Sequence, residues 1–319
     1  MTLSIIIVNW NSKDYVRQCL TSLEKYRPSI DFEVIVVDGA SFDGCDAMLA
    51  ANFPSAKYVQ SDRNIGFARA NNLGVEHSSG EYLMFLNPDT EFLEDSITPL
   101  LVQLRALPGA GAIGCKLLNS DGSLQTSCVQ SFPTPINQAL DSEFLRRKFP
   151  KSSLWGMAAL YSSSTVAAEI EAVSGACIVS RRAAFDSVGG FSDSYFMYGE
   201  DLDLCFKLRE GGHPVYYLPS TSIVHHGGGS TKASVSNFSN VMMRESVFRF
   251  LRAHRGLVSA ALYRLGMAVT ALLRLALILP IMAVSRDRMV HHSRDSLKKW
   301  KAILRWSFGL ESWAREAPL

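Results

Sequence analysis

The sequence predicts an α/β fold: a mostly parallel sheet with helices on both faces, followed by a helical C-terminal appendage. Three observations predict it. Residues 3–8 and 32–37 are short, nearly unbroken β-branched runs, as expected for parallel strands covered on both faces. A stretch with apolar residues at helical spacing separates them, which makes a βαβ unit. Charge and composition then change together near residue 240.

The elements of the first half follow one another regularly. The first helix is predicted by Tyr15, Cys19 and Leu23, which recur at helical spacing, and Ser12 precedes them as an N-cap. The cycle then repeats with a helix near 43–51, a strand near 56–60, a helix near 66–77 and a strand at 81–86. Alternation of this kind predicts an α/β sheet.

The second half is less regular. From about 119 to 173 the pattern weakens into stretches containing Ser, Pro and Gln, and a loop of this length is usually functional or mobile. We then predict a strand at 173–180, a helix near 182–188, a helix from about 201 to 211, a strand at 214–218 and a glycine-rich loop at 227–231. The predicted domains are therefore a body, 1–232, and a tail, 233–319.

The composition bounds the class of protein. A chain of 319 residues with 47% hydrophobic content can bury a full core and is expected to form one large domain with an appendage. Its six cysteines are scattered without a CxxC pair, which argues against a zinc cage or disulfide framework and favours a reducing compartment. The N-terminal apolar run lacks a basic region and a cleavage site, so we expect no signal peptide.

The net charge of +2 hides an asymmetry. Residues 244–319 carry 14 Lys/Arg against 5 Asp/Glu, or +9, which leaves −7 for residues 1–243. An acidic body suits metal binding, whereas a basic tail rich in Leu and Ala suits an anionic membrane surface.

Polar residues follow the predicted strands. In open α/β sheets, ligands bind beyond the carboxyl ends of the strands, so residues at these positions are candidates for chemistry. They are Asn9, Asp38, Arg63 and the turn Asn87-Pro88-Asp89. The first strand is followed by no G-x-G-x-x-G turn, which argues strongly against a nicotinamide dehydrogenase.

Several sequence blocks, in order, resemble the inverting glycosyltransferases of family 2, which have the GT-A fold, and their rhamnosyltransferase branch in particular. The resemblance covers roughly residues 3–230. The blocks are Ser4–Asn11, Val36–Asp38, Arg63–Asn72, Leu86–Thr90, Gly199–Leu204 and Val224–Gly227. Two departures are Asp38-Gly39-Ala40-Ser41, where the family usually has Asp-Asn-Ala/Gly-Ser, and Asn87-Pro88-Asp89, which supplies one carboxylate instead of the two of Asp-x-Asp.

The resemblance implies a divalent metal, Mg²⁺ or Mn²⁺, at the turn that carries Asp89. These cations prefer oxygen ligands and stabilise a departing diphosphate. The alternative is an ordinary turn with an Asx hydrogen bond. Family members commonly add a histidine ligand here; spacing does not choose between His225 and His226, and we name His225.

The resemblance also implies a nucleotide-sugar site and a catalytic base. The base is Asp201, with Glu200 beside it; the alternative is an acidic first turn of a helix, which carboxylates favour without any catalytic role. We interpret Arg69 as an exposed arginine of a capped helix and leave it out of the site. For Asp38, the alternative to nucleotide contact is the role of a carboxylate at a helix N-terminus. The nucleotide-sugar residues are Asn9, Asp38, Arg63, Asn64, Gly66, Asn71 and Asn87.

The tail is both apolar and basic. Residues 257–284 are largely apolar but contain Arg264, Arg274 and Pro280, and Trp300 and Trp306 follow among lysines and arginines. An amphipathic helix at the cytoplasmic leaflet fits this pattern better than a clean span, and a helical cap packed on the body or on a second subunit is the alternative.

The expected function is transfer of a sugar, rhamnose by resemblance, from a dTDP- or UDP-sugar to a glycan or lipid-linked saccharide. The expected location is cytoplasmic, at the inner face of the cell membrane. We expect no nucleic-acid partner, and the sequence leaves the oligomeric state open. The alternative is a catalytically inactive sugar-nucleotide-binding scaffold of the same fold.

Overall fold

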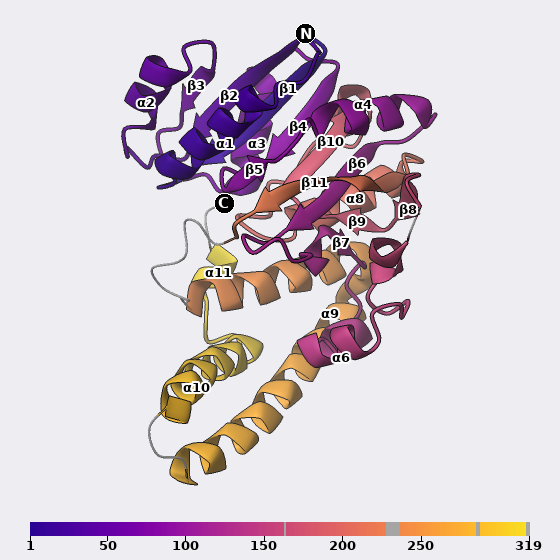
Figure 1. The fold of residues 1–319 in the computed structure, drawn as a ribbon. Coiled ribbons are helices and arrows are strands. Elements are labelled where there is room, and N and C mark those ends of the chain that lie inside the picture. Colours follow the sequence, from indigo (N-terminus) through magenta and orange to yellow (C-terminus); the bar gives the residue numbers. More distant parts are fainter. Residues whose placement is uncertain (163, 228–236, 285–287, 317–319) are drawn as a thin grey trace. The chain divides into compact units, whose positions relative to one another are not determined.

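The computed structural model describes residues 1–162, 164–227, 237–284 and 288–316, and the described part contains a nine-stranded mixed sheet (Figure 1). The strand order is β3-β2-β1-β4-β10-β6-β11-β5, and β8 pairs with β11 beside this path. The predicted α/β class is thereby confirmed. The strands are β1 (Leu3–Asn9), β2 (Phe32–Asp38), β3 (Lys57–Gln60), β4 (Tyr82–Leu86), β5 (Thr90–Phe92), β6 (Ala112–Leu118), β8 (Ala168–Ile170), β10 (Cys177–Arg181) and β11 (Val215–His225).

The first four strands form a parallel βαβ array. β1 pairs in parallel with β2 and β4, and β2 with β3. Helices α1 (Lys13–Lys25) and α2 (Cys45–Asn52) connect strands in one direction along the sheet, and α3 (Phe67–Glu76) connects β3 to β4 in the opposite direction. Right-handed crossovers therefore put α3 on the face opposite α1 and α2. Every residue of β1 is buried, as the unbroken apolar run predicts.

The rest of the sheet is mixed. β10 runs antiparallel between β4 and β6, and β11 is parallel to β6 but antiparallel to β5. The elements without a prediction in this part include α4 (Ile97–Ala106) and the strands β5, β6 and β8. The single strand predicted at 173–180 is wrong: β9 (Ala172–Val173) and β10 are separated by a turn that the Cys177 amide closes on the Ser174 carbonyl at 3.3 Å. The last predicted strand continues to His225.

The weakly patterned region contains short elements. β7 (Val129–Gln130) pairs antiparallel with β9 in a separate small sheet. The helices α7 (Arg182–Ser187) and α8 (Glu200–Glu210) agree with the predicted 182–188 and 201–211. The remaining elements here are η1 (Thr126–Cys128), α5 (Pro135–Ala139), α6 (Glu143–Lys148) and η2 (Met157–Tyr161).

The described residues group into two compact units. The first consists of Met1–Phe132, Phe149–Phe196 and the described part of Glu200–Lys232, and it holds the sheet. The second consists of Pro133–Lys148, Met197–Gly199 and the described part of the tail. The unit that contains the tail thus includes two segments from within the predicted body. The predicted loop at 227–231 lies outside the described residues, apart from Gly227.

The described part of the tail consists of three helices: α9 (Asn237–Val284), α10 (Arg288–Ser307) and α11 (Trp313–Glu316). Gly256, at φ 82°, interrupts α9. The expectation that Trp306 belongs to a surface-facing basic and aromatic segment is wrong: Trp306 is 1% exposed and its indole N–H donates to Glu245 at 2.8 Å. Among the described helices, only Asn237–Pro280 is long and apolar enough to cross a membrane by length and composition.

The strand order reverses between β1 and β4, because the chain moves from β1 outward to β3 and then returns to β4. At such a point the connections that follow the two strands leave towards opposite faces of the sheet, which is where open α/β sheets bind ligands. Asn9 and the Asn87–Asp89 turn follow these two strands. His225 at the end of β11 is in register with Thr90, so it lies at the same edge.

Candidate active site

One dipeptide connects the two acidic positions that the sequence singles out. The amide of Gly175 donates to Asp201 Oδ2 at 2.9 Å, and the carbonyl of the next residue, Ala176, accepts from the Asn87 amide at 3.0 Å. Glycine at position 175 favours this approach, because a Cβ there would lie 3.3 Å from the Cβ of Asp201. The break between β9 and β10 thus brings the start of α8 next to the Asn87–Asp89 turn.

Asp201 is a half-buried carboxylate surrounded by donors. Its Oδ2 also accepts from Gln130 Nε2 at 3.1 Å, and its Oδ1 accepts from the Leu202 amide at 2.9 Å. Burial raises the pKa of Asp201, and the hydrogen bonds from Gly175, Leu202 and Gln130 oppose this rise. These donors favour the ionised form of Asp201.

Glu200 has a different environment. It is 7% exposed, and its Oε2 has no hydrogen-bond partner among the described residues. Burial, together with the charge of Asp201, raises the pKa of Glu200 to about 8. Near neutral pH Glu200 is therefore largely protonated, and the negative charge of the pair lies on Asp201. Asp203 belongs to another cluster, where it accepts from Ser192 at 2.5 Å and pairs with Lys207 at 3.4 Å.

The second centre contains Asp89, His225 and Asn87. His225 Nε2 lies 3.3 Å from Asp89 Oδ1 and 3.2 Å from Asn87 Nδ2. His225 Nδ1 lies 2.8 Å from Gln125 Oε1, which can only accept, so the hydrogen on Nδ1 fixes the tautomer with a lone pair on Nε2. An imidazole lone pair and a carboxylate oxygen thus face each other, and both are ligands that a divalent cation accepts.

The structure separates the two histidines that spacing leaves equivalent. His226 Nδ1 is 2.8 Å from Ser120 Oγ and its Nε2 is 3.2 Å from Glu91 Oε2, so its ring is directed to a different set of partners. Its backbone amide donates to the Asp89 carbonyl at 2.9 Å. Of the pair, His225 is the residue that faces Asp89. The described residues contain no group of three or more His, Cys, Asp or Glu side chains that could hold a metal.

Asn9 and Asp38 are fully buried and bind each other. Asn9 Nδ2 donates to Asp38 Oδ2 at 2.5 Å, and Asp38 also accepts from the hydroxyl and amide of Ser41 and from Gln60. Burial raises the pKa of Asp38, but these hydrogen bonds outweigh it and leave that pKa below its ordinary value. Ser12 occupies the N-cap position, yet its hydroxyl donates to Asn9 instead of capping α1. Asn9 and Asp38 therefore hold the loops that follow β1 and β2 in place.

The loop before α3 lies against these loops. A Cβ on Gly39 would lie 3.5 Å from the Asn9 carbonyl and 3.7 Å from Asn64 Oδ1, and Asn64 accepts from the Gly66 amide at 3.0 Å. Arg63 is exposed and Asn64 is half-buried, so both offer atoms at this surface.

Gly66 is required by a close approach to protein backbone. A Cβ at this position, which has φ +83°, would lie 2.5 Å from the carbonyl oxygen of Phe196, and the Phe67 amide donates to that same oxygen at 2.7 Å. The neighbour that excludes a side chain here is therefore Phe196, and the expected contact of Gly66 with the nucleotide sugar stays a prediction.

Asn71 is a buried residue whose Nδ2 donates to the Phe67 carbonyl within α3 at 2.9 Å. The next residue, Asn72, is not among the site residues predicted from the sequence. Its amide group donates to the Phe191 carbonyl at 2.8 Å and accepts from the Phe191 amide at 3.0 Å. Asn72 thereby attaches α3 to the segment that leads towards Glu200 and Asp201.

Comparison with known proteins agrees with this geometry. Residues 4–166, which are 163 of the 319 residues, match the family model described as glycosyl transferase family 2. The chain belongs to glycosyl transferase family 2. The family 2 fold also agrees with solved structures: the mannosyltransferase PcManGT from Pyrobaculum calidifontis, in complex with GDP-Man and Mn²⁺, superposes with a TM-score of 0.61 at 16% identity, over 97% of this chain and 86% of that one.

Two curated relatives of this family 2 glycosyltransferase are rhamnosyltransferases. The N-acetylglucosaminyl-diphospho-decaprenol L-rhamnosyltransferase of Mycobacterium tuberculosis is 29% identical over 72% of this chain and 77% of its own length. The rhamnosyltransferase WbbL of Escherichia coli K12 is 26% identical over 79% of this chain and 93% of its own length. The resemblance to the rhamnosyltransferase branch is therefore confirmed, and the chain is a glycosyltransferase.

The site of this family 2 glycosyltransferase contains residues that sequence reasoning missed. Gln125 and Gln130 come from the weakly patterned region, where neither periodicity nor a motif marks them. Gly175 and Ala176 lie within what reads as a continuous strand. The sequence offered two weak signals: Gln125 and Gln130 are polar residues near an apolar segment, and Gly175 is a glycine inside a strand pattern.

Proposed function

We propose that this glycosyltransferase is a metal-dependent inverting enzyme that transfers a sugar from a nucleoside diphosphate sugar to a hydroxyl of a glycan or lipid-linked saccharide. The observation that carries the proposal is the link through Gly175 and Ala176, which brings the Asp201 carboxylate and the Asn87–Asp89 turn to opposite sides of one dipeptide. A base and a diphosphate-binding centre must be close together for one transfer reaction.

Asp201 acts as the general base in this proposal. The attacking hydroxyl must lose its proton as it bonds to the anomeric carbon, and a carboxylate can accept that proton. Protonated Glu200 supports this role, because it leaves the negative charge on Asp201 near neutral pH. The raised pKa of Asp201 makes it a stronger base than a carboxylate in water.

Asp89 and His225 would hold the divalent metal, Mg²⁺ or Mn²⁺. The pair fits because two acceptor atoms, Asp89 Oδ1 and His225 Nε2, face each other at 3.3 Å, and Gln125 fixes the ring orientation of His225. Two protein ligands suffice where substrate phosphate oxygens and water complete the shell. A bound cation would supply positive charge to the departing diphosphate. Asn87 Nδ2 lies 3.2 Å from the same Nε2, so this amide would have to turn away from the ring when the metal binds.

The nucleotide would bind where the loops after β1 and β2 meet the loop before α3. Arg63 and Asn64 would contact it directly, because their side chains are accessible. Asn9 and Asp38, being buried, would contribute by fixing the loop shape, and Gly66 and Asn71 by fixing the start of α3. In this proposal Asp38 does not contact the nucleotide directly, which differs from the expectation based on the resemblance.

We propose dTDP-rhamnose as the donor and a lipid-linked saccharide as the acceptor. Both curated relatives are named rhamnosyltransferases, and the mycobacterial name includes a diphospho-decaprenol lipid. A lipid acceptor would place the enzyme at the inner face of the cell membrane. The tail supports this location, because α9 exposes a stripe of large apolar residues: Val258, Leu262, Leu265, Val269, Leu272 and Leu279.

The proposal is tested by incubating the purified chain with a panel of sugar nucleotides and a lipid-linked saccharide, with Mg²⁺ or Mn²⁺ and then with excess chelator. We expect transfer from dTDP-rhamnose with inverted anomeric configuration, measured by NMR of the product, and loss of transfer with chelator. Thermal protection by each nucleotide gives donor binding independently. Donor binding without any transfer would instead favour the inactive scaffold.

A further inference from the structure

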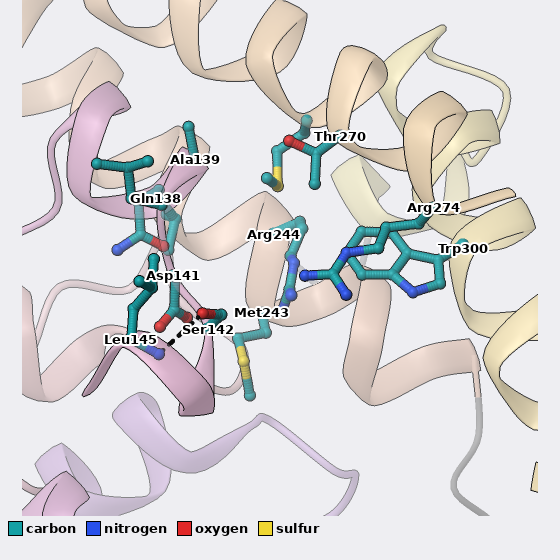
Figure 2. Close-up of a pocket in the computed structure, with 13 residues that line it drawn as sticks. Gln138, Ala139, Asp141, Ser142, Leu145, Met243, Arg244, Thr270, Arg274 and Trp300 are labelled. Carbon is teal, nitrogen blue, oxygen red and sulfur yellow. Dashed lines mark hydrogen bonds between the residues drawn. The ribbon is translucent and has the colours of Figure 1, made fainter. Parts of the chain in front are cut away.

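A cavity lies inside the second unit, and none of the residues assigned to the reaction lines it. Its volume is about 200 Å³, and it is lined by α5 and the residues that follow it, by α9 and by α10 (Figure 2). Leu140, Leu145, Met243, Val247 and Met267 make part of its wall apolar. Gln138, Ser142 and Thr270 add polar groups that can form hydrogen bonds.

Positive charge gathers on one side of this cavity. Arg244 and Arg274 both line it, and Figure 2 shows them on the side of Trp300, with Asp141 and Ser142 on the other. Neither guanidinium makes an ion pair or hydrogen bond with any residue that the structure describes, and Arg274 lies over the ring of Trp300 at 5.6 Å.

A third cation, Lys299, belongs to the same group. Burial lowers the pKa of Lys299, and the charges of Arg244 and Arg274 lower it further, although Asp141 acts in the opposite direction. Asp141 offsets the charge of the group only in part, because its Oδ1 also pairs with Arg146 Nε at 2.8 Å. The protein therefore keeps three cations close together with one shared carboxylate.

Such an arrangement is stabilised by an anion, and two unpaired arginines match the oxygens of a phosphate. The apolar wall made by Leu145, Met243 and Met267 suits the carbon chain attached to it. We propose that this cavity binds the phosphate group of a lipid, with the phosphate between Arg244 and Arg274 and the first carbons of the chain against the methionines and leucines. The site goes beyond the proposed reaction and does not depend on it.

Two sources could supply this chemistry: a lipid diphosphate such as the proposed acceptor carries, or the headgroup of an anionic membrane phospholipid. The probes are farnesyl diphosphate and dihexanoyl phosphatidylglycerol, with inorganic pyrophosphate and farnesol as partial ligands. Binding is measured by calorimetry on the full chain. Saturable binding of one probe identifies the source, and the partial ligands are expected to bind at least about tenfold more weakly.

The matched variants are Arg244→Gln and Arg274→Gln, singly and together, with Arg252→Gln as control. Arg252 is an exposed arginine of the same helix that does not line the cavity. We expect each single variant to weaken lipid phosphate binding at least about tenfold and the control to bind as the parent does. Circular dichroism checks folding, and protection by the sugar nucleotide checks the first unit.

The proposal is overturned if neither probe binds the parent chain, if the double variant binds the probes as the parent does, or if pyrophosphate alone binds as tightly as farnesyl diphosphate. If the parent chain binds lipid phosphate but transfers no sugar, the result counts against the proposed reaction alone. Failure of the lipid phosphate site and failure of the proposed reaction are therefore distinguishable.

Discussion

At the scale of single residues, the site depends on how each polar atom is satisfied. Asp201 and Glu200 are neighbours in the chain, yet three N–H donors surround the first, whereas Glu200 Oε2 has no partner among the described residues. Two carboxyl groups with different environments take different protonation states. This difference assigns the charge of the pair to Asp201.

The raised pKa of Glu200 predicts a change in stability with pH. Because the native state keeps the proton up to about pH 8 while the unfolded chain loses it near 4.5, stability falls as pH rises through this window. Glu200→Gln removes this loss and is expected to be more stable than the parent at pH 9, on the order of 2 kcal/mol, but not at pH 4. Urea unfolding at several pH values measures it, and identical pH profiles for both proteins would contradict the assignment.

The histidine pair gives a second prediction at this scale. His225→Ala should increase the metal concentration needed for half-maximal transfer at least about tenfold, because it removes a direct ligand. His226→Ala is the matched control, since its ring contacts Ser120 and Glu91 instead, and it should shift that concentration less than about threefold. The reverse order of effects would exchange the roles of the two histidines.

At the scale of elements, the sequence predicted the regular part of the fold and missed the irregular part. All the elements predicted between residues 3 and 86 are present, because buried parallel strands and amphipathic helices leave strong periodic signals. The break at Ser174–Ala176 leaves no such signal, since small and apolar residues surround it. The two-residue strand β7 is too short for any periodicity.

The strand β7 positions a side chain that influences the pKa of Asp201. Gln130, at the end of β7, donates to Asp201 Oδ2, and this bond lowers the pKa of Asp201. Gln130→Ala should therefore raise that pKa and move the acid limb of the kcat–pH profile upward by about 0.5 to 1 unit, since the base must be ionised. Gln18→Ala, an exposed change on α1, is the control. An unmoved limb would mean that Asp201 does not set it.

The candidate site could be predicted as a set of positions but not as a set of roles. Asp89, His225 and Asp201 were all named from motifs, and the structure brings Asp89 and His225 into contact. The role of Asn9 and Asp38 could not be found this way, because a polar residue after a strand looks the same whether it faces a ligand or a neighbouring loop. Burial alone distinguishes the two cases.

At the scale of the whole molecule, charge asymmetry divides the chain into an acidic body and a basic tail. The acidic charge includes the carboxylates of the proposed site, and the tail combines exposed apolar side chains with the cations of α9 and α10. The sequence indicated this division. It could not reveal that residues 133–148 join the tail unit, because that grouping depends on long-range packing.

The exposed stripe of α9 predicts membrane binding. Leu265→Glu with Leu272→Glu places two charges on the proposed membrane face, where leucines are 62% and 51% exposed. We expect vesicle co-sedimentation to fall at least about tenfold, because each charge must leave water on insertion. Val102→Glu, an exposed change in the body, is the control. Unchanged co-sedimentation of the double variant would exclude this face.

In the function that we propose, Asp201 is the base of a site that it shares with the Asn87–Asp89 turn. The most direct measurement is turnover and donor binding by Asp201→Asn, which preserves size but cannot accept the proton. We predict donor binding within about threefold of the parent and a fall in kcat of about 10²- to 10⁴-fold. Turnover equal to that of the parent would contradict the account.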